Sequence, residues 1–158
     1  MAAKPNHNES KIQIQCVTWF KYQYPHLAPL FFAVPNGGSR DKREAAIMKA
    51  EGITSGVSDL ILNIRGGSHT QLAIEMKDTK GTQSAAQKRY QRYAEAAGIK
   101  YIICRSFESF QDEVRNYIDT INPLILQQLA DIHQEEKRRE VEEARLQYQT
   151  RCNTTLNK

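Results

Sequence analysis

Two carboxylates and an amine, Asp59, Glu75 and Lys77, are the residues of this chain whose types and spacing best fit a chemical task. Two carboxylates that face each other across a sheet, with Cβ atoms roughly 4.5–5.5 Å apart, repel unless a positive charge lies between them. A divalent cation such as Mg²⁺ suits that position because it takes oxygen ligands and keeps several of its waters. It can polarise a phosphoryl oxygen and activate a water, while a nearby ammonium stabilises developing negative charge. The pattern therefore points to metal-assisted hydrolysis of a phosphate ester.

The elements that must position these residues are the two strands of a hairpin. Residues 59–65 and 71–77 are rich in strand formers, and two glycines mark the turn between them. Side chains alternate along a strand, so Glu75 and Lys77 share a face. If the turn centres on Gly67, Asp59 stands opposite Glu75; a register shifted by one residue sends Glu75 to the other face. The alternative is a solvated polar face of an amphipathic strand, which the position of Asp59 weakens without removing.

The rest of the chain alternates helix and strand signals. The pattern predicts helices over 9–24, 42–50, 84–97 and 107–120, and strands over 30–34 and 100–104. With the hairpin, this order predicts an α/β domain over residues 1–122. Residues 123–158 differ, with an apolar stretch over 124–132 and a charged, helix-prone stretch over 133–149. They predict a C-terminal helical extension.

Composition and charge narrow the class of protein. The chain has 158 residues, of which 40% are hydrophobic, enough for one domain with its own core. No apolar run approaches the roughly 20 residues that span a bilayer, and no secretory signal begins the chain, so we expect a cytoplasmic protein without a membrane partner. The three cysteines form no CxxC pair and are expected to be reduced. The net charge of +4 lies within residues 1–122, which hold 16 Lys/Arg and 12 Asp/Glu, and it suits a polyanionic partner.

The Asp59…Glu75-Met76-Lys77 pattern resembles the signature of the PD-(D/E)XK nuclease superfamily. Its context is similar to the virus-type replication-repair nuclease branch, VRR-NUC. The resemblance covers about residues 9–105, in five segments: Glu9 with Ile12-Gln13, then 34–40 (VPNGGSR), 52–59 (GITSGVSD), 74–77 (IEMK) and 84–87 (SAAQ). Ser58 stands where the superfamily name has Pro, at a position that is not a ligand.

The resemblance implies a restriction-endonuclease-like core, a central mixed sheet of about four strands flanked by helices. It also implies a nuclease that uses Mg²⁺ or Mn²⁺ and water to leave 5′-phosphate ends on DNA. In such a site Asp59, Glu75 and the backbone carbonyl of Met76 bind the metal, and Lys77 assists catalysis.

Two further site residues are implied by the same resemblance. Glu9 is expected to reach the metal from the first helix, and Gln87 to lie near the reacting groups. Each has a plainer alternative. Glu9 also favours the beginning of a helix, where an acidic side chain is stabilising. Gln87 also completes a Ser84-x-x-Gln87 capping box.

Candidate DNA contacts come from glycines that let a backbone approach a phosphate and from nearby cations. The residues that we assign to substrate binding are Asn36, Gly37, Gly38, Arg40, Lys80 and Lys88, with Arg89 and Arg92 as further cations on the same helix. The alternatives are an ordinary turn at 36–38 and a solvated helix face.

An apolar patch begins the extension and needs a partner surface. It consists of Leu124, Ile125, Leu129 and Ile132. It can pack on its own domain or on a second copy of the chain. Stand-alone members of the resembled family are similar to junction-resolving enzymes, in which a two-fold dimer presents two sites to a symmetric junction, and this favours a homodimer.

The sequence thus predicts a homodimeric, structure-selective DNA endonuclease acting on branched DNA such as a Holliday junction. A bacterial or phage-encoded repair or recombination protein fits its size. A flap or nonspecific nuclease with the same site, and a non-catalytic DNA-binding module, stay open. Zinc-based and nucleoside-triphosphate-driven enzymes are disfavoured, because the chain has neither a Cys/His ligand set nor a GxxxxGK[ST] loop.

Overall fold

The computed structural model describes residues 7–35 and 42–156, and the chain divides into two compact units, residues 1–122 and 123–158. The helices of the first unit are α1 (His7–Gln23), the 3₁₀ helix η1 (Pro25–Leu30), α2 (Lys42–Ala50), α3 (Ala85–Ala96) and α4 (Phe107–Ile118). Its strands are β1 (Phe31–Ala33), β2 (Leu60–Leu62), β3 (Leu72–Met76) and β4 (Lys100–Cys104). The second unit is the helix α5 (Pro123–Leu156).

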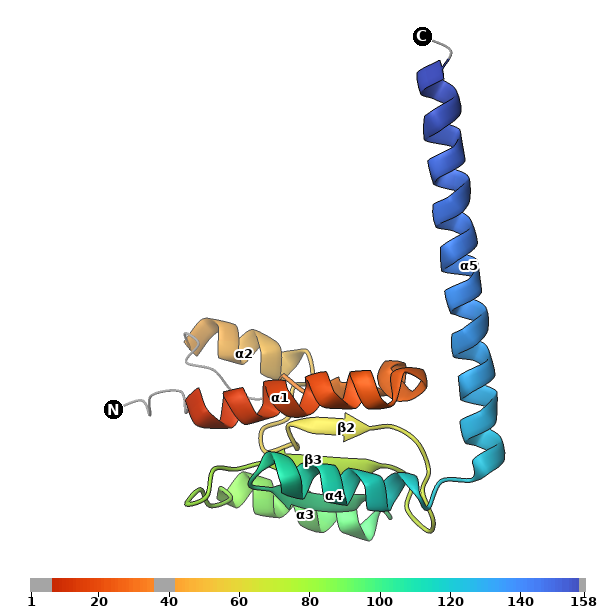
Figure 1. The fold of residues 1–158 in the computed structure, drawn as a ribbon. Helices are drawn as coiled ribbons and strands as arrows, with labels where there is room; N and C mark the ends of the chain where they lie inside the picture. Colours follow the sequence, from red (N-terminus) through yellow and green to blue (C-terminus); the bar gives the residue numbers. More distant parts are fainter. Residues whose placement is uncertain (1–6, 36–41, 157–158) are drawn as a thin grey trace. The chain divides into compact units, whose positions relative to one another are not determined.

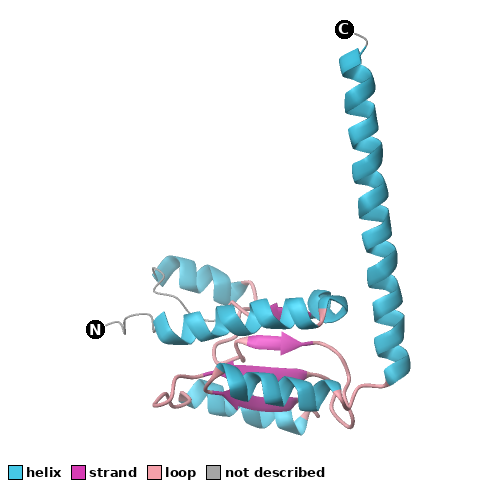
Figure 2. Ribbon diagram, in the orientation of Figure 1, coloured by secondary structure: helices cyan, strands magenta, loops and turns pink. Residues whose placement is uncertain are grey.

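The strands form one mixed sheet in the order β1-β2-β3-β4 (Figures 1 and 2). β1 and β2 pair antiparallel, as do β2 and β3, whereas β3 and β4 are parallel. Parallel neighbours need a crossover, and α3 supplies it. The predicted fold class, a central mixed sheet of about four strands with flanking helices, is confirmed.

The hairpin has the register in which Asp59 and Glu75 oppose each other. Leu60 pairs with Ile74, and Leu62 pairs with Leu72. β2 is shorter than the predicted strand over 59–65. Between the Leu62–Leu72 pair and the Gly66–His69 bridge, the first arm of the hairpin has three residues and the second has two. This extra residue interrupts the ladder after Leu62.

The first strand of the sheet is also shorter than the prediction over 30–34. Leu30 ends the 3₁₀ helix η1, which begins at Pro25 and contains Pro29. The ladder with β2 covers residues 31–33, and single hydrogen bonds from Asn63 N to Leu30 O and from Val34 N to Asp59 O lie just beyond its ends.

Both faces of the sheet are buried. On one face, buried strand residues such as Leu62 and its partner Phe31 pack under α1 and α4, where Phe20 stacks on Phe31 with ring centroids 4.0 Å apart and Phe110 also contacts Phe31. On the other face a second cluster joins the sheet to α3. It comprises Ile61, Ala73, Ala94 and Tyr101, with Val34, Tyr90, Ile99 and Ile103 packed against it. The face that carries Glu75 is therefore covered by a helix rather than solvated.

Gly98 ends α3 with a left-handed residue. Its φ is +78°, and its amide donates to Glu95 O at 3.0 Å while the amide of Ile99 donates to Ala94 O at 2.9 Å. This pair of bonds satisfies the last carbonyls of the helix. The chain then enters β4 directly, which returns it beside β3.

The helix α5 spans both the apolar and the charged stretches predicted after residue 122. Leu124 and Ile132 of the apolar patch are 73% and 53% exposed. Spaced ion pairs such as Glu135–Arg139 and Glu142–Arg145 lie along the charged stretch. Within residues 7–35 and 42–156, no helix is both long and apolar enough to cross a membrane.

Candidate active site

The end of β3 carries the two charged residues of the predicted site. Glu75 lies in β3 and is fully buried, and Lys77 is the first residue after the strand. The amide of Lys77 still donates to Cys104 O at 2.9 Å, so the pairing with β4 continues through this residue. The two side chains therefore share the face covered by α3, and Nζ of Lys77 lies 2.7 Å from Oε1 of Glu75.

Asp59 reaches the same place from the other arm of the hairpin. It directly precedes β2, and its backbone oxygen accepts a hydrogen bond from the amide of Val34. Its carboxylate oxygen Oδ2 accepts a hydrogen bond from the amide of Met76 at 2.8 Å. The side chain of Asp59 is thus anchored to the backbone between Glu75 and Lys77.

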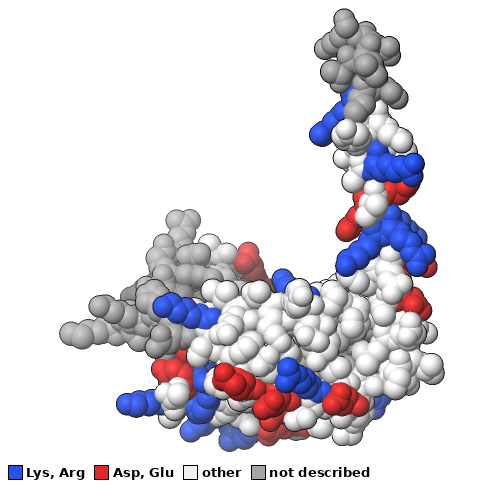
Figure 3. Space-filling view, in the orientation of Figure 1, with Lys and Arg blue, Asp and Glu red and all other residues white. Residues whose placement is uncertain are grey.

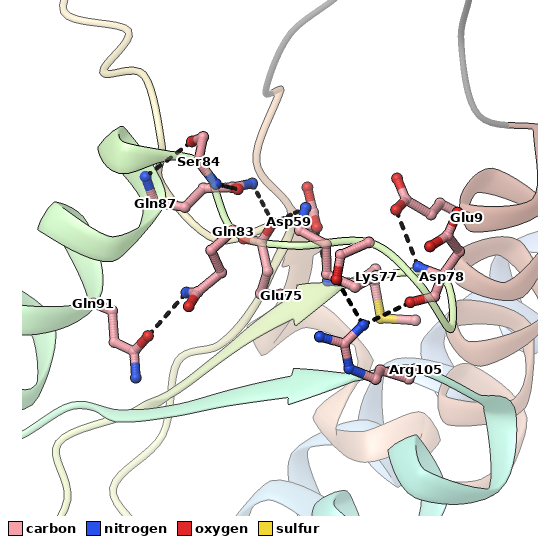
Figure 4. A network of polar contacts seen from close by, with 12 residues as sticks. Glu9, Asp59, Glu75, Lys77, Asp78, Gln83, Ser84, Gln87, Gln91 and Arg105 are labelled. Atoms are coloured by element: carbon pink, nitrogen blue, oxygen red, sulfur yellow. Dashed lines mark hydrogen bonds and ion pairs between the residues drawn. The ribbon is translucent and has the colours of Figure 1, made fainter.

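Three side chains hold the buried carboxylate of Glu75, and two of them, Lys77 and Gln87, are drawn in Figure 4. Lys77 forms the ion pair at Oε1, and the side-chain amide of Gln87 donates to the same oxygen. The hydroxyl of Tyr101 donates to Oε2 at 3.2 Å. A buried ionised carboxylate is costly unless it is paired and hydrogen-bonded, and these contacts meet that condition.

The charges at the site perturb one another. Burial raises the pKa of Glu75, and the charge of Asp59 raises it further, against the hydrogen bond from Lys77. Burial also raises the pKa of Asp59, against the hydrogen bond from Met76. Burial lowers the pKa of Lys77, but its hydrogen bond to Glu75 and the surrounding carboxylates outweigh this and leave the pKa raised. Lys77 is therefore an ammonium at neutral pH, held against the carboxyl group of Glu75 and close to that of Asp59.

Glu9 approaches the site from α1. Its Oε1 accepts a hydrogen bond from the amide of Asp78 at 3.0 Å, one residue beyond Lys77. Its charge acts on both Asp59 and Lys77. Gly81 lies against it, since a Cβ at Gly81 would be 3.3 Å from Oε1 of Glu9. The expected approach of Glu9 to the site is thus seen in the geometry, although its bond is to backbone.

Arg105 closes the loop that leads away from Lys77. Its Nη1 donates to Asp78 O at 2.7 Å and to Gly81 O at 2.8 Å. The two bonds tie both ends of a four-residue turn to the residue that follows β4. The loop is therefore held by a cation rather than by regular secondary structure.

Gln87 combines the two roles that the sequence left as alternatives. Its side-chain Oε1 accepts a hydrogen bond from the backbone amide of Ser84 at 2.8 Å. The backbone amide of Gln87 donates to Oγ of Ser84 at 3.2 Å, which completes a capping box. Its Nε2 is left to donate to Glu75. The cap fixes the orientation in which Gln87 meets the site.

The structure brings together five of the predicted site residues: Glu9, Asp59, Glu75, Lys77 and Gln87. Met76 offers its amide to Asp59. Lys80 and Lys88 are exposed, on the loop after Lys77 and on α3. The predicted DNA contacts Asn36, Gly37, Gly38 and Arg40 lie outside the described residues.

Tyr101, Gln83 and Arg105 contact the site but were not among the predicted residues. Gln83 donates from Nε2 to Oε1 of Gln91 at 2.8 Å and to the hydroxyl of Tyr101 at 3.4 Å. A signal for Tyr101 was present, because a tyrosine in a buried strand needs a partner for its hydroxyl. No such signal points to Gln83 or Arg105, whose partners come from the packing of separate elements.

The donor set suits a hard cation with few protein ligands. Over the described residues, no group of three or more His, Cys, Asp or Glu side chains is arranged to hold a metal. Asp59 and Glu75 offer two carboxyl groups at the end of β3, and Mg²⁺ is commonly bound by one or two carboxylates with waters. The residues present fit such an ion.

The fold and these contacts define an α/β domain in which one strand ends in a buried carboxylate–lysine pair, beside a second carboxylate from its hairpin partner. No protein-family model matches this chain, and no curated protein matches it. A solved structure named "VRR_NUC domain protein" is similar to this chain, with a TM-score of 0.64 and 23% sequence identity. The likeness covers 77% of this chain and 94% of that one. It confirms the VRR-NUC-like fold that the sequence resemblance implies.

Proposed function

We propose that this chain is a metal-dependent DNA nuclease of the VRR-NUC type. The observation that carries the proposal is the convergence of Asp59, Glu75 and Lys77 at the end of β3 in a fold similar to that of a VRR_NUC domain protein. The same three residues follow the superfamily signature in the sequence. Fold and site chemistry thus point independently to phosphodiester hydrolysis.

In this proposal Asp59 and Glu75 hold a Mg²⁺ or Mn²⁺ ion together with the backbone carbonyl of Met76, and Glu9 contributes through a water. The ion supplies Lewis-acid stabilisation of the phosphate and a water of lowered pKa. The carboxyl oxygens of Asp59 and Glu75, which meet at the end of β3, are the hard donors that such an ion would take. A bound cation would favour the ionised form of both carboxyl groups, against the burial that raises their pKa values.

Lys77 acts as a charge and not as a base. Its raised pKa keeps it protonated at neutral pH, so it cannot accept a proton from water. Its ammonium, held by Oε1 of Glu75, can stabilise negative charge on a phosphate oxygen or orient the attacking water. Gln87 and Tyr101 keep the carboxylate of Glu75 oriented while this happens.

The proposed substrate is branched DNA, with a Holliday junction as the first candidate, cut by a homodimer in the cytoplasm of a bacterium or an infected cell. The basic excess of residues 1–122 supports a polyanionic substrate, and Lys80 and Lys88 are exposed near the site. The exposed apolar residues of α5 support self-association. The predicted contacts of Asn36, Gly37, Gly38 and Arg40 with the DNA backbone belong to the same proposal.

Cleavage of labelled DNA tests the proposal. Wild-type protein, Asp59→Ala and Glu75→Gln are incubated with a four-way junction, a flap and a blunt duplex, each with Mg²⁺, Mn²⁺ or EDTA. We expect metal-dependent cutting by the wild type and its loss in both variants.

Light scattering of the full chain measures whether it forms the proposed dimer. Paired nicks on the junction support a resolvase, and cutting of the flap alone or of every substrate supports the alternative nucleases. Binding without cutting under all conditions supports the DNA-binding module and overturns the catalytic proposal.

A further inference from the structure

A groove of about 540 Å³ lies beside the candidate site, between the loop before β2 and the outer side of α3. Thr54 and Ser55 form one wall, and Arg89, Tyr90 and Tyr93 form the other with two alanines of the first turn. The volume falls in the range of roughly 300–1,000 Å³ that small-ligand sites occupy. The contacts so far assigned to the candidate site use none of these five side chains.

The α3 wall presents an aromatic ring with a cation over it. Tyr93 is 67% exposed, and the guanidinium carbon of Arg89 lies 5.8 Å from the centroid of its ring. The cation–π contact orders a planar donor group over a planar ring. Exposed tyrosine rings and arginine planes are the surfaces on which unpaired nucleobases stack.

The groove is joined to the site by short, rigid connections. Tyr90 forms its inner side, and its ring meets that of Tyr101 edge-on at 6.1 Å. The hydroxyl of Tyr101 in turn donates to Glu75. One aromatic ring thus separates the groove from a residue that contacts the buried carboxylate.

The other wall is equally close to the site. A Cβ at Gly56 would lie 2.5 Å from the carbonyl carbon of Ala86, so this loop is packed on the first turn of α3. Gly56, with φ of +85°, is next to Ser55 of the groove and three residues before Asp59. Ala86 is next to Gln87, which contacts Glu75. The two walls of the groove therefore continue directly into the site.

The charge of the surface favours approach of DNA on the α3 side. α3 carries Lys88, Arg89 and Arg92 against Glu95, whereas α4 carries three acidic residues against one arginine. In Figure 3, Lys and Arg side chains gather at the lower left, over the loop after Lys77 and the beginning of α3, and acidic side chains lie over α4. A polyanion is attracted to the first surface and repelled from the second.

We propose that the groove binds an unpaired nucleobase of the DNA strand whose phosphate lies at Asp59 and Glu75. The base stacks on Tyr93, and Arg89 contacts its phosphate or its exposed face. This inference rests on the proposed nuclease function and names its substrate class: DNA that offers an unpaired nucleotide next to the cut, as a flap, a gap or an opened junction does. A fully paired blunt duplex cannot fill the groove without losing a base from its stack.

Binding in EDTA, where no cutting is expected, tests the groove separately from the chemistry. Full-length protein is titrated with a fluorescent blunt duplex and with the same duplex carrying a short single-stranded flap that contains 2-aminopurine. The variants are Tyr93→Ala, Tyr93→Phe and Arg89→Ala. The matched control is Tyr22→Ala, because Tyr22 is an exposed tyrosine of α1 with 87% exposure.

We expect Tyr93→Ala to weaken flap binding roughly tenfold to hundredfold, the loss of one stacked base, and to leave blunt-duplex binding unchanged. Tyr93→Phe keeps the ring and should keep both the affinity and the 2-aminopurine quenching. Arg89→Ala should weaken flap binding, and Tyr22→Ala should change neither substrate. Equal loss on flap and duplex, or no loss in Tyr93→Ala, overturns the groove proposal.

The two proposals fail in different ways. If wild-type protein cuts DNA with Mg²⁺ or Mn²⁺ but Tyr93→Ala binds and cuts flap and duplex in the wild-type ratio, the groove proposal fails and the nuclease stands. If selective, Tyr93-dependent flap binding is seen and no metal supports cutting, the nuclease fails and the groove remains as a binding site.

Discussion

The side-chain amide of Gln87 bonds in two directions at once: its Nε2 donates to Oε1 of Glu75, and its Oε1 accepts from the amide of Ser84. The residue that caps α3 is thereby also the residue that orients the buried carboxylate. One side chain therefore links the beginning of α3 to a candidate catalytic group. Because different atoms of Gln87 make the two contacts, substitutions can affect one contact more than the other.

Substitutions at this helix end should separate the two roles. Gln87→Ala removes both and should lower the free energy of unfolding by about 1 kcal/mol, with roughly 10- to 100-fold less cleavage. Gln87→Glu keeps an acceptor for Ser84 but places a second carboxylate against the buried Glu75, so we expect both the free energy of unfolding and the cleavage rate to fall. Ser84→Ala is the matched control, with a lost cap and nearly normal cleavage. Denaturant unfolding and cleavage rates are the measurements, and full activity in Gln87→Glu contradicts the orienting role.

Tyr101→Phe removes one hydroxyl from Oε2 of Glu75 and leaves the buried ring in place. We expect a change in unfolding free energy of no more than about 1.5 kcal/mol, because only one hydrogen bond is lost. Cleavage should fall roughly 10- to 100-fold, since a group that positions a metal-binding carboxylate is removed. Thermal unfolding and single-turnover cleavage measure the two effects. A fall in stability with no change in rate would assign Tyr101 a purely structural role.

Arg105 should govern the mobility of the loop after Lys77. Arg105→Lys keeps the charge but shortens the side chain, so we expect it to lose at least one of the two bonds that Nη1 donates to Asp78 O and Gly81 O. Hydrogen exchange of the amides of Lys80 and Gly81 should accelerate about tenfold, as expected for the loss of a bond worth ~1–2 kcal/mol. Arg139→Ala, at an exposed arginine of α5, is the control. Unchanged exchange in Arg105→Lys would mean that the loop is held by other contacts.

Removal of one carboxylate should stabilise the metal-free protein. Burial raises the pKa of Asp59 in the folded state, so its favourable contribution is complete below the unfolded pKa and is lost as pH rises through the folded pKa. At neutral pH its charge therefore opposes folding when no cation is bound. Asp59→Asn keeps an acceptor for the amide of Met76, and we expect a higher Tm than wild type in EDTA.

Divalent cations should reverse this order. Mn²⁺ or Mg²⁺ at a hundredfold excess over its Kd should stabilise the wild type by about 2.7 kcal/mol and should not stabilise Asp59→Asn. Differential scanning fluorimetry at neutral pH measures both proteins side by side. An equal rise in Tm for wild type and variant would place the cation elsewhere in the molecule.

Cys16 and Cys104 should be inert in the native state. Both are buried, and burial raises the pKa of each thiol to about 12, so almost no thiolate is present at pH 8. In a Cys152→Ser background, iodoacetamide should label neither residue until denaturant unfolds the chain. Because both folded-state pKa values are raised, stability should decline as pH rises above about 9, where unfolded thiols ionise first. Rapid labelling of native protein contradicts this account.

The residue pattern was sufficient to predict the order of helices and strands, but it left two registers of the hairpin open. Periodicity, turn residues and caps are local properties, whereas the pairing of β2 with β3 in the folded chain chose the register that places Asp59 opposite Glu75. The pairing of Asp59 with Glu75 followed from that register alone. The strand ends at Leu62 and Phe31 were predicted less well, because they depend on a ladder break and on prolines packed into η1.

The partners of the site were decided by the tertiary structure. Tyr101, Gln87 and Arg105 reach Glu75 and the loop after Lys77 only because α3 crosses the face that carries Glu75 and β4 lies parallel to β3. The groove beside Tyr93 likewise exists because Gly56 lets its loop pack on α3. These contacts join residues far apart in the chain, and no local pattern specifies which distant side chain will meet a buried carboxylate. The sequence by itself determined which groups can do chemistry and on which strands they lie; the packing of separate elements determined what holds them in place and which surface the substrate meets.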